Sequence, residues 1–394
     1  MNEVPVTSSP SAPSAPGSTR PAGPAKAVME TQGLLEINEK GFGFLRVKER
    51  NYQASREDVF VSPNLIRDLK LREGLDVVGT TRQSNKGGLE LSEVKTLNGL
   101  SHADYVKLPN FQSLTVIDPI SQIHFETGPE PISNRIIDMF VPIGRGQRGL
   151  IVSPPKSGKT TLLKQMGQAV LKNHPDIHLM VLLVDERPEE VTDFKRSVDK
   201  AEIFASSNDE AVKNHCLIAR LATEKARRLV EMGKDVVMLL DSLTRVARAF
   251  NNYSSDSGRT LSGGLDSRAM EIPRKIFASA RKAEEAGSLT ILATILVDTG
   301  SRMDELIFQE FKGTGNMEFV LDRGLAEKRV FPAVDINKSG TRKEEKLIDQ
   351  KRLDKIHILR RQLASKNPHE STEALVRAMQ KTKSNDEILA MIMG

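Results

Sequence analysis

The sequence predicts an α/β protein in which a small N-terminal β-barrel precedes a mainly parallel sheet. Residues 33–97 form short alternating runs separated by turn residues, a spacing typical of a small barrel. Beyond residue 130, apolar strand-like runs alternate with amphipathic segments, as in βαβ units. The first 30 residues are rich in Pro, Ser and Ala and are expected to be disordered. We therefore expect a tail (1–30), a barrel (31–97), a linker (98–130) and an α/β domain (131–394).

Composition narrows the classes of protein to consider. The 394 residues carry a formal net charge of +5, which permits a nucleic-acid partner without establishing one. A single cysteine, Cys216, excludes an internal disulfide framework and a multi-cysteine metal site. The sequence has no apolar run of about 18 residues and no signal-peptide pattern, so we expect a cytoplasmic protein without a membrane partner.

Individual elements follow from the same patterns. The expected barrel strands lie at residues 34–37, 42–47, 58–61, 75–78 and 89–91. The expected strands of the α/β domain lie at residues 149–152, 179–185, 236–241 and 289–296. Helices are expected from residue 159 and over residues 209–232. The charged region past residue 342 is helix-like, with stops near residues 367 and 384.

The strongest motif is the segment Ser153–Thr161, which stands between a strand and a helix. A phosphate is bound by backbone N–H groups, a helix N-terminus and a fixed positive charge. Gly158 lets the backbone approach, Lys159 reaches the β- and γ-phosphates, and the Thr160 hydroxyl can bind Mg²⁺. The usual pattern begins with glycine, whereas this one begins with serine. The strand–turn–helix context nevertheless favours a P-loop over a chance turn.

Two acidic sites follow apolar strands and therefore emerge at the carboxyl edge of the sheet. Asp241 is the expected metal partner, and Glu186 is the expected base for the attacking water. For Asp185 alone, a helix cap is the simpler interpretation. Hydrolysis also needs a positively charged side chain that stabilises the negative charge developing on the γ-phosphate. Arg329 and Arg342 are the candidates. Spacing alone does not choose between them or exclude surface salt bridges.

A second motif, Lys40–Leu45, fits the aromatic RNA-binding signature. Strand periodicity places Phe42 and Phe44 on one face, where exposed rings would stack on unpaired bases. The alternative is that both rings pack inside the barrel, which the flanking glycines disfavour. Arg46 on the same face could hold a phosphate or stack on a base, and Phe60 is either a third ring or a core residue.

Basic residues also occur in glycine- and turn-rich stretches of the α/β domain. Arg259 lies in the segment Ser257–Gly264, while Arg302 and Lys312 lie between residues 298 and 316. Flexible basic loops suit a moving grip on a phosphate backbone, although they could equally be ordinary surface loops.

Together these segments resemble the Rho family of bacterial transcription termination factors, which are ring-shaped hexameric RNA helicases. The resemblance covers roughly residues 33–394. The segments that carry it are Pro142–Val152, Pro154–Thr160, Asp185–Thr192, Leu240–Arg245, Glu310–Met317, Glu327–Pro332 and Ser339–Glu344.

The resemblance implies a RecA-like ATPase core, a cold-shock-like OB barrel, ATP with Mg²⁺, single-stranded RNA and a homohexamer. It leaves open RNA polymerase and elongation factors as protein partners. It implies that Arg342 is an arginine finger supplied to a neighbouring subunit, with Arg329 as its companion, and that Phe331 stacks on adenine. The residues expected to contact the nucleotide are Lys156, Ser157, Gly158, Lys159, Thr160, Thr161, Arg187 and Phe331. The sequence departs from the family in having arginines at 259 and 302 in place of lysines, and Gly-Gly-Leu-Glu-Leu at residues 87–91 in place of an aromatic.

Two other classes of protein remain open. A rotary or secretion-type ATPase also joins a β-barrel to a P-loop core, but its barrel would be structural and its aromatic face buried. A passive RNA-binding protein with a degenerate P-loop is the weaker alternative. The Lys40–Leu45 signature argues against the first, and under the second Lys159→Ala should leave every activity intact.

Overall fold

The computed structural model describes Met1 and residues 29–84, 87–254, 265–266 and 268–392. The expected disordered tail, apart from its first and last two residues, and Arg259 lie outside these ranges. Met29 and Glu30, which we assigned to the tail, instead begin the first strand of the barrel.

The N-terminal unit is a closed barrel with strand order β1-β2-β3-β5-β4, as predicted. Its elements are β1 (Met29–Ile37), β2 (Gly43–Arg46), η1 (Lys48–Arg50), β3 (Val59–Val61), α1 (Pro63–Asp68), β4 (Asp76–Gln83) and β5 (Leu89–Leu97). Alternate residues of β2 and β3 point inward, so Leu45, Val59 and Val61 join the barrel core.

The expected linker, residues 98–130, contains short elements that pack on both neighbours. These are α2 (His102–Tyr105), η2 (Phe111–Ser113), β6 (Val116–Ile117) and β7 (Gln122–Ile123). Tyr105 completes the barrel core, whereas Phe111 and Leu114 are buried against the α/β domain. The segment therefore fastens the barrel to the rest of the chain.

The α/β domain is built on a sheet with order β11-β10-β12-β14-β9-β15-β16, in which β16 is antiparallel to β15. Its strands are β8 (Ile143–Gly144, paired with β7), β9 (Arg148–Ser153), β10 (His178–Glu186), β11 (Glu202–Ser207), β12 (Asp235–Asp241), β13 (Arg281–Ala283), β14 (Ser288–Leu296), β15 (Met317–Val320) and β16 (Gly340–Thr341). In the spatial order β11-β10-β12-β14-β9-β15, neighbouring strands are parallel. Their nearly continuous apolar sequence reflects burial on both faces.

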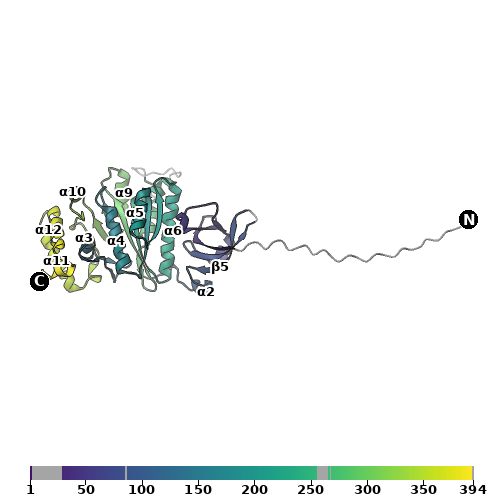
Figure 1. The fold of residues 1–394 in the computed structure, drawn as a ribbon, viewed down its shortest axis with the longest axis horizontal. Coiled ribbons are helices and arrows are strands. Elements are labelled where there is room, and N and C mark those ends of the chain that lie inside the picture. Colours follow the sequence, from purple (N-terminus) through teal and green to yellow (C-terminus); the bar gives the residue numbers. More distant parts are fainter. Residues whose placement is uncertain (2–28, 85–86, 255–264, 267, 393–394) are drawn as a thin grey trace.

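Helices cover both faces of this sheet (Figure 1). They are α3 (Ile132–Phe140), α4 (Lys159–Asn173), α5 (Pro188–Ser197), α6 (Val212–Glu231), α7 (Leu243–Ser254), α8 (Glu271–Phe277), α9 (Arg302–Phe311), α10 (Arg323–Glu327), η4 (Glu344–Lys346), α11 (Gln350–Ala364), α12 (Pro368–Gln380) and α13 (Asn385–Ala390). The C-terminal helices pack at the end of the domain opposite the barrel, and α6 lies between the sheet and the barrel. None of the helices in the described ranges is long and apolar enough to cross a bilayer.

One sequence prediction of local structure was wrong. The stretch 298–316, which we expected to be turn-rich, is mostly the helix α9. Its glycines lie outside the helical turns, and Ser301 caps the helix by accepting a hydrogen bond from Asp304 N. Smaller differences occur elsewhere, as in α6, which begins at Val212 rather than at residue 209.

Candidate nucleotide site and RNA-binding surface

The segment Ser153–Thr161 joins β9 to α4 at the carboxyl edge of the sheet. Gly158 is the N-cap of α4 at φ +93°, a conformation that favours glycine. The buried Ser157 hydroxyl lies 2.9 Å from Ser153 Oγ and donates to Pro154 O at 2.8 Å. The loop is therefore tied to itself, and the first turn of α4, whose N–H groups have no intrahelical partner, lines a pocket.

Three chemically active side chains meet beside this loop. Lys159 Nζ donates to Glu186 Oε1 at 3.1 Å and also to Asp241 Oδ1. Glu186 ends β10 and Asp241 ends the neighbouring strand β12, so both reach the same edge of the sheet. Both carboxylates are at most 3% exposed. The three predicted residues thus share one buried site.

Burial and charge set the protonation of this cluster. Burial and, to a smaller extent, the nearby Asp241 raise the pKa of Glu186 to about 7, although Lys159 and Arg245 oppose the rise. For Lys159, burial disfavours the ammonium, but Asp241 and Glu186 outweigh it and raise the pKa. The lysine therefore stays charged, whereas Glu186 can exchange a proton near neutral pH.

Two residues that position the acids had no role expected from the sequence. Arg245, one turn along α7 from Asp241, lies 3.4 Å from Asp185 and 3.5 Å from Glu186. Thr294 in the apolar strand β14 donates to Asp241 Oδ1 at 2.7 Å. A threonine in a buried apolar run is a usable sequence signal, because a buried hydroxyl requires a partner.

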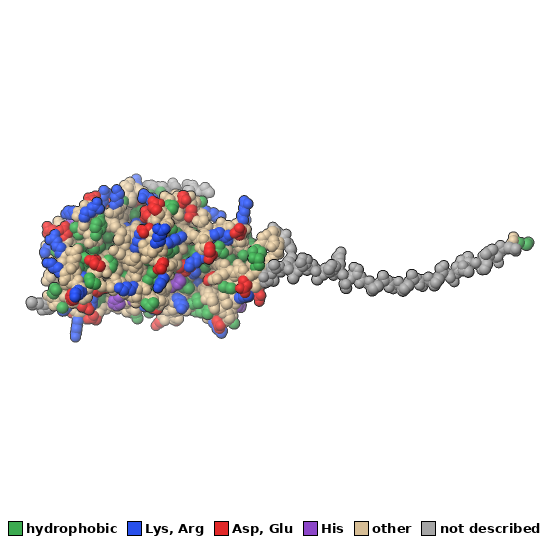
Figure 2. Space-filling model, viewed as in Figure 1, with side chains coloured by type: hydrophobic (Ala, Val, Ile, Leu, Met, Phe, Trp, Pro, Cys, Tyr) green, Lys and Arg blue, Asp and Glu red, His purple; other side chains and the backbone are tan. Residues whose placement is uncertain are grey.

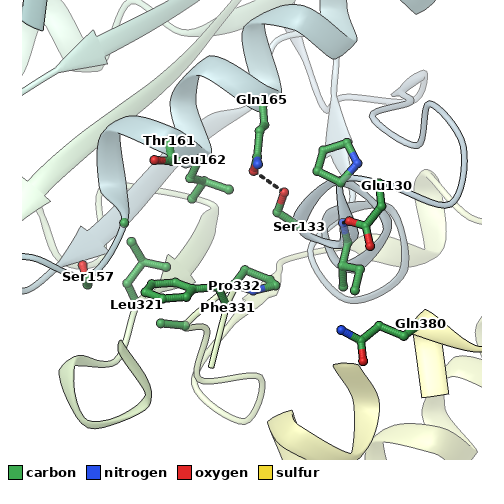
Figure 3. Close-up of a pocket in the computed structure, with 14 residues that line it drawn as sticks. Glu130, Ser133, Ser157, Thr161, Leu162, Gln165, Leu321, Phe331, Pro332 and Gln380 are labelled. Carbon is green, nitrogen blue, oxygen red and sulfur yellow. Dashed lines mark hydrogen bonds between the residues drawn. The ribbon is translucent and has the colours of Figure 1, made fainter. Parts of the chain in front are cut away.

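A second cavity of about 470 Å³ opens on the other side of Gly158 and Thr161 (Figure 3). Its walls are mainly apolar, and the 47% exposed Phe331 ring lies beside Leu321 and Ser157. A β-carbon added at Gly158 would lie 3.7 Å from this ring, so ring and P-loop are in close contact. The shape suits a flat ring system whose phosphates extend into the first pocket.

Polar groups line the rim of this cavity. Ser133 Oγ donates to Gln165 Oε1 at 2.6 Å, and Gln380 of α12 faces them across the opening. The buried Arg135 fixes the relative position of α3 and the C-terminal helices by donating to Met379 O at 2.7 Å and Thr382 O at 2.9 Å. Both walls of the cavity are thus fastened together.

The other predicted nucleotide contacts divide into two groups. Lys156 and Arg187 line the phosphate pocket and have exposed side chains. Arg329 is exposed and lies two residues before Phe331, hence near this chain's own cavity. Arg342 does not lie there. Its backbone N bonds Asn316 O next to the first residue of β9, whereas the P-loop follows the last residue. Six residues of strand separate the two by about 20 Å.

The aromatic surface of the barrel is formed by three rings. Phe42, Phe44 and Phe60 have centroids 5.6 to 5.9 Å apart, and each is half-buried. None belongs to the barrel core, which is made of other residues of the same strands. Packing of Phe42 and Phe44 inside the barrel, the alternative considered from sequence, is therefore wrong.

Arg46 lies beside these rings, with its guanidinium 5.0 Å from the Phe44 centroid. Its side chain is nevertheless 8% exposed and bonded to both Glu36 and Asp58. It is therefore not free to hold a phosphate in this conformation, contrary to one of the two roles expected from sequence. The two acids hold it where it supports the Phe44 ring.

Arg302 and Lys312 stand at opposite ends of α9 and are both exposed. The helix places them about 15 Å apart. Figure 2 shows basic and acidic side chains interspersed over the visible face, so the net charge is not gathered into one patch there.

Comparison with known proteins gives a consistent result for both halves of the chain. Residues 31–103 match the RNA-binding domain of the Rho termination factor, and residues 133–341 match the nucleotide-binding domain of the ATP synthase alpha/beta family. A transcription termination factor Rho of Aquifex aeolicus is 47% identical, and the match covers 91% of this chain and 83% of the relative. One of Salmonella typhimurium is 47% identical over 91% of this chain and 87% of its own.

Solved structures share the fold at lower identity. A type III secretion system ATPase superposes with a TM-score of 0.57 and 26% identity, over 72% of this chain and 80% of the other. The ATP synthase subunit NeqB of Nanoarcheaum equitans superposes with a TM-score of 0.54 and 21% identity, over 64% of this chain and 62% of the other, a likeness of fold alone.

Fold and site together define a RecA-like P-loop ATPase that carries an OB-type RNA-binding barrel on the same chain. This confirms the predicted fold class. The chain belongs to the transcription termination factor Rho family, as the sequence motifs indicated.

Proposed function

We propose that this chain is an RNA-stimulated ATPase that moves along single-stranded RNA as a ring and terminates transcription. The observation that carries the proposal is the coexistence of two sites on one chain. One is Lys159 between two buried carboxylates beside a P-loop, and the other is a triad of half-buried rings on the barrel surface. The nucleic acid is nascent RNA, and the chain would act in the cytoplasm.

The nucleotide is ATP, with its base against Phe331 and its phosphates along the P-loop. Lys156 and Arg187 line the phosphate pocket and would contact the outer phosphates. The Thr160 hydroxyl and the Asp241 carboxylate supply the oxygen donors that Mg²⁺ prefers. When bound, the metal ion would neutralise charge that develops on the β- and γ-phosphates.

In hydrolysis, Glu186 accepts a proton from water as the water oxygen bonds to the γ-phosphorus and the bond to the β-phosphate oxygen breaks. Its raised pKa fits this role, because the group must take up and release a proton near neutral pH. Lys159 stabilises charge on the phosphates from within the same chain. Arg342 faces away from its own site, so it would serve the neighbour's γ-phosphate in a ring of six.

RNA would contact the chain in two places. Phe42, Phe44 and Phe60 would stack on unpaired bases, with Arg46 orienting Phe44. Arg302, Lys312 and Arg259 would contact the phosphate backbone in the centre of the ring, where a change of subunit position can pull the strand. RNA polymerase and elongation factors are further partners to be tested.

A secretion-type ATPase is the second candidate, because such a protein superposes on this chain. In that case the rings on the barrel would have no role with RNA. Their position outside the core and the match of residues 31–103 to an RNA-binding domain favour the first proposal.

The deciding experiment measures ATP hydrolysis by the purified full-length chain with and without single-stranded RNA. We expect RNA to increase turnover by roughly tenfold or more, since an in-trans arginine is worth at least this much once positioned. Double-stranded DNA is the control and should not stimulate. Equal turnover with and without RNA would overturn the proposal and favour the secretion-type alternative.

A further inference from the structure

The turn that joins α9 to β15 connects two residues with separate roles in the proposed function. It begins at Lys312, the C-cap of α9, and ends at Asn316 just before Met317. Lys312 is exposed and, among the described residues, has no acidic partner; its ammonium lies 5.7 Å from the Phe308 centroid. It is therefore available to an anion.

Asn316 is the point where three segments of the chain meet. Its side-chain Oδ1 accepts from Arg148 N at 2.9 Å and from Gln147 Nε2 at 2.7 Å. Its backbone N donates to Arg148 O at 2.9 Å. Its backbone O accepts from Arg342 N at 2.9 Å and from Gln147 Nε2 at 3.1 Å. We call this set of contacts the Asn316 bracket.

The turn itself is short and tightly packed. Thr314 N bonds Phe311 O at 2.9 Å, and Arg148 Nε donates to Thr314 O. A β-carbon at Gly315 would lie 3.3 Å from Arg148 O, so the turn has little room to deform independently. A displacement of Lys312 would therefore be passed to Asn316.

Arg342 is held mainly through its backbone at this point. It follows the two-residue strand β16 at the edge of the sheet. Its side chain is exposed and, within the described part of the chain, has no hydrogen bond or ion pair. The next residue, Lys343, is fastened to Asp118. The position of the Arg342 guanidinium thus depends on the Asn316 bracket on one side and on the Asp118 contact on the other.

We propose that Asn316 is a positioning residue, which ties the backbone of Arg342 to the turn that begins at Lys312. RNA bound by Lys312 in one subunit then sets the position of the arginine that the same subunit offers to its neighbour's ATP. This inference rests on the proposed function and adds to it the contact through which RNA binding is sensed.

The test uses full-length Asn316→Ala and Asn316→Asp. The alanine removes the acceptor for Arg148 N and Gln147 Nε2, whereas the aspartate keeps it. For Asn316→Ala we expect nearly unchanged RNA affinity, ATP affinity and RNA-free turnover, but a loss of roughly tenfold to a hundredfold in RNA-stimulated turnover. Asn316→Asp should recover most of the stimulation. Gln309→Ala, which removes an exposed amide on α9, is the matched control and should behave as wild type.

A mixing experiment distinguishes a role of Asn316 in positioning Arg342 from a purely structural role in the sheet. When Asn316→Ala subunits are mixed with Glu186→Ala subunits, some sites combine an intact Glu186 with an Arg342 held by an intact bracket in the neighbour. We expect these rings to regain RNA-stimulated turnover. No recovery at any ratio would show that Asn316 acts on its own P-loop through β9 and would overturn the proposal.

Two further outcomes are informative. If Asn316→Ala does not fold, Gln147→Met removes the amide that makes two of the hydrogen bonds in the bracket and should give the same selective loss. Full stimulation in that variant would overturn the inference. If RNA does not stimulate the wild-type chain, the proposed function fails. If RNA stimulates the wild type and the Asn316 variants equally, only the inference about Asn316 fails.

Discussion

Glu186 and Asp241 illustrate how two carboxylates in one buried site take different roles. Asp241 accepts a hydrogen bond from Thr294 and one from Lys159, both of which stabilise its charge. Glu186 has weaker support from Lys159 and Arg245, so burial raises its pKa to about 7. The first is suited to a metal ion and the second to proton transfer.

Replacing Glu186 with glutamine should therefore abolish proton transfer without emptying the site. The amide keeps the size of the carboxylate but cannot accept the proton from water. We expect kcat to fall by roughly a hundredfold to ten-thousandfold, with ATP affinity within a few fold of wild type. Glu189→Gln on the exposed first turn of α5 is the control. Steady-state kinetics with a nucleotide-binding assay gives both numbers, and unchanged kcat would exclude Glu186 as the base.

The rings of the barrel surface give a second prediction for individual residues. Each base–ring stack contributes about 1–3 kcal/mol, so Phe42→Ala with Phe44→Ala should weaken binding of a short single-stranded RNA by roughly two orders of magnitude or more. The barrel should remain folded, because neither ring is in its core. Fluorescence anisotropy measures the affinity and circular dichroism the fold. Wild-type affinity in the folded double variant would place RNA elsewhere.

At the level of elements, the barrel is docked on the ATPase domain through a few specific contacts. Asn51 pairs its side-chain amide with the backbone of Ala205 in the edge strand β11. Tyr52 stacks on Phe204 with centroids 4.5 Å apart and donates to Glu202 at 2.6 Å. Glu202 also bonds His178 at 2.9 Å and Lys225 at 2.5 Å. The RNA-binding and ATPase units are therefore held in one orientation.

This contact predicts a dependence of stability on pH. Burial alone would raise the pKa of Glu202, but the bonds from His178, Lys225 and Tyr52 lower it to about 2, against an ordinary value of 4.5. A lowered pKa contributes stability that is present above pH 4.5 and lost as the pH falls toward 2. The unfolding free energy of the wild type should therefore fall between pH 5 and pH 3, and Glu202→Gln should make this fall smaller by roughly 1–3 kcal/mol.

Urea unfolding at several pH values measures this effect. Glu49→Gln, an exposed residue of the same junction, is the matched control and should retain the wild-type slope. A slope for Glu202→Gln equal to wild type would mean that the junction does not depend on the charge of this carboxylate.

The sequence predicted those elements whose signal is local. The apolar runs of β9, β10, β12 and β14 predicted the sheet. The P-loop motif after β9 predicted Lys159, and the acids that end β10 and β12 predicted Glu186 and Asp241, because strand ends share an edge. The helix α9 was missed, because its flanking glycines resemble turn signals. The bonds of Arg46 to Glu36 and Asp58 and of Tyr52 to Glu202 were not predictable, because they join residues that only the tertiary fold brings together.

At the scale of the whole molecule, the proposed function divides the hydrolytic site between two copies of the chain. Its own sheet separates Arg342 from the P-loop by about 20 Å, and the arginine side chain is exposed with no described partner. Arg329 is nearer, but it lies on the side of the base cavity, two residues from Phe331. Under the proposed function, Arg342 therefore serves the γ-phosphate bound by another copy, which makes turnover a property of the assembly.

Mixing two inactive variants tests this directly. Arg342→Ala subunits keep Glu186, and Glu186→Ala subunits keep Arg342, so a mixed ring contains some sites with both groups. If positions fill at random, an equal mixture gives an intact pair at about a quarter of the interfaces, and RNA-stimulated turnover should approach roughly that fraction of wild type, provided sites act independently. Each variant alone should stay inactive. Adding Lys159→Ala to the Arg342→Ala chain should abolish the recovery, because this chain supplies the P-loop of the mixed site. Activity that remains at the level of the separate variants, while cross-linking shows that the rings are mixed, would mean that Arg342 does not act across the interface.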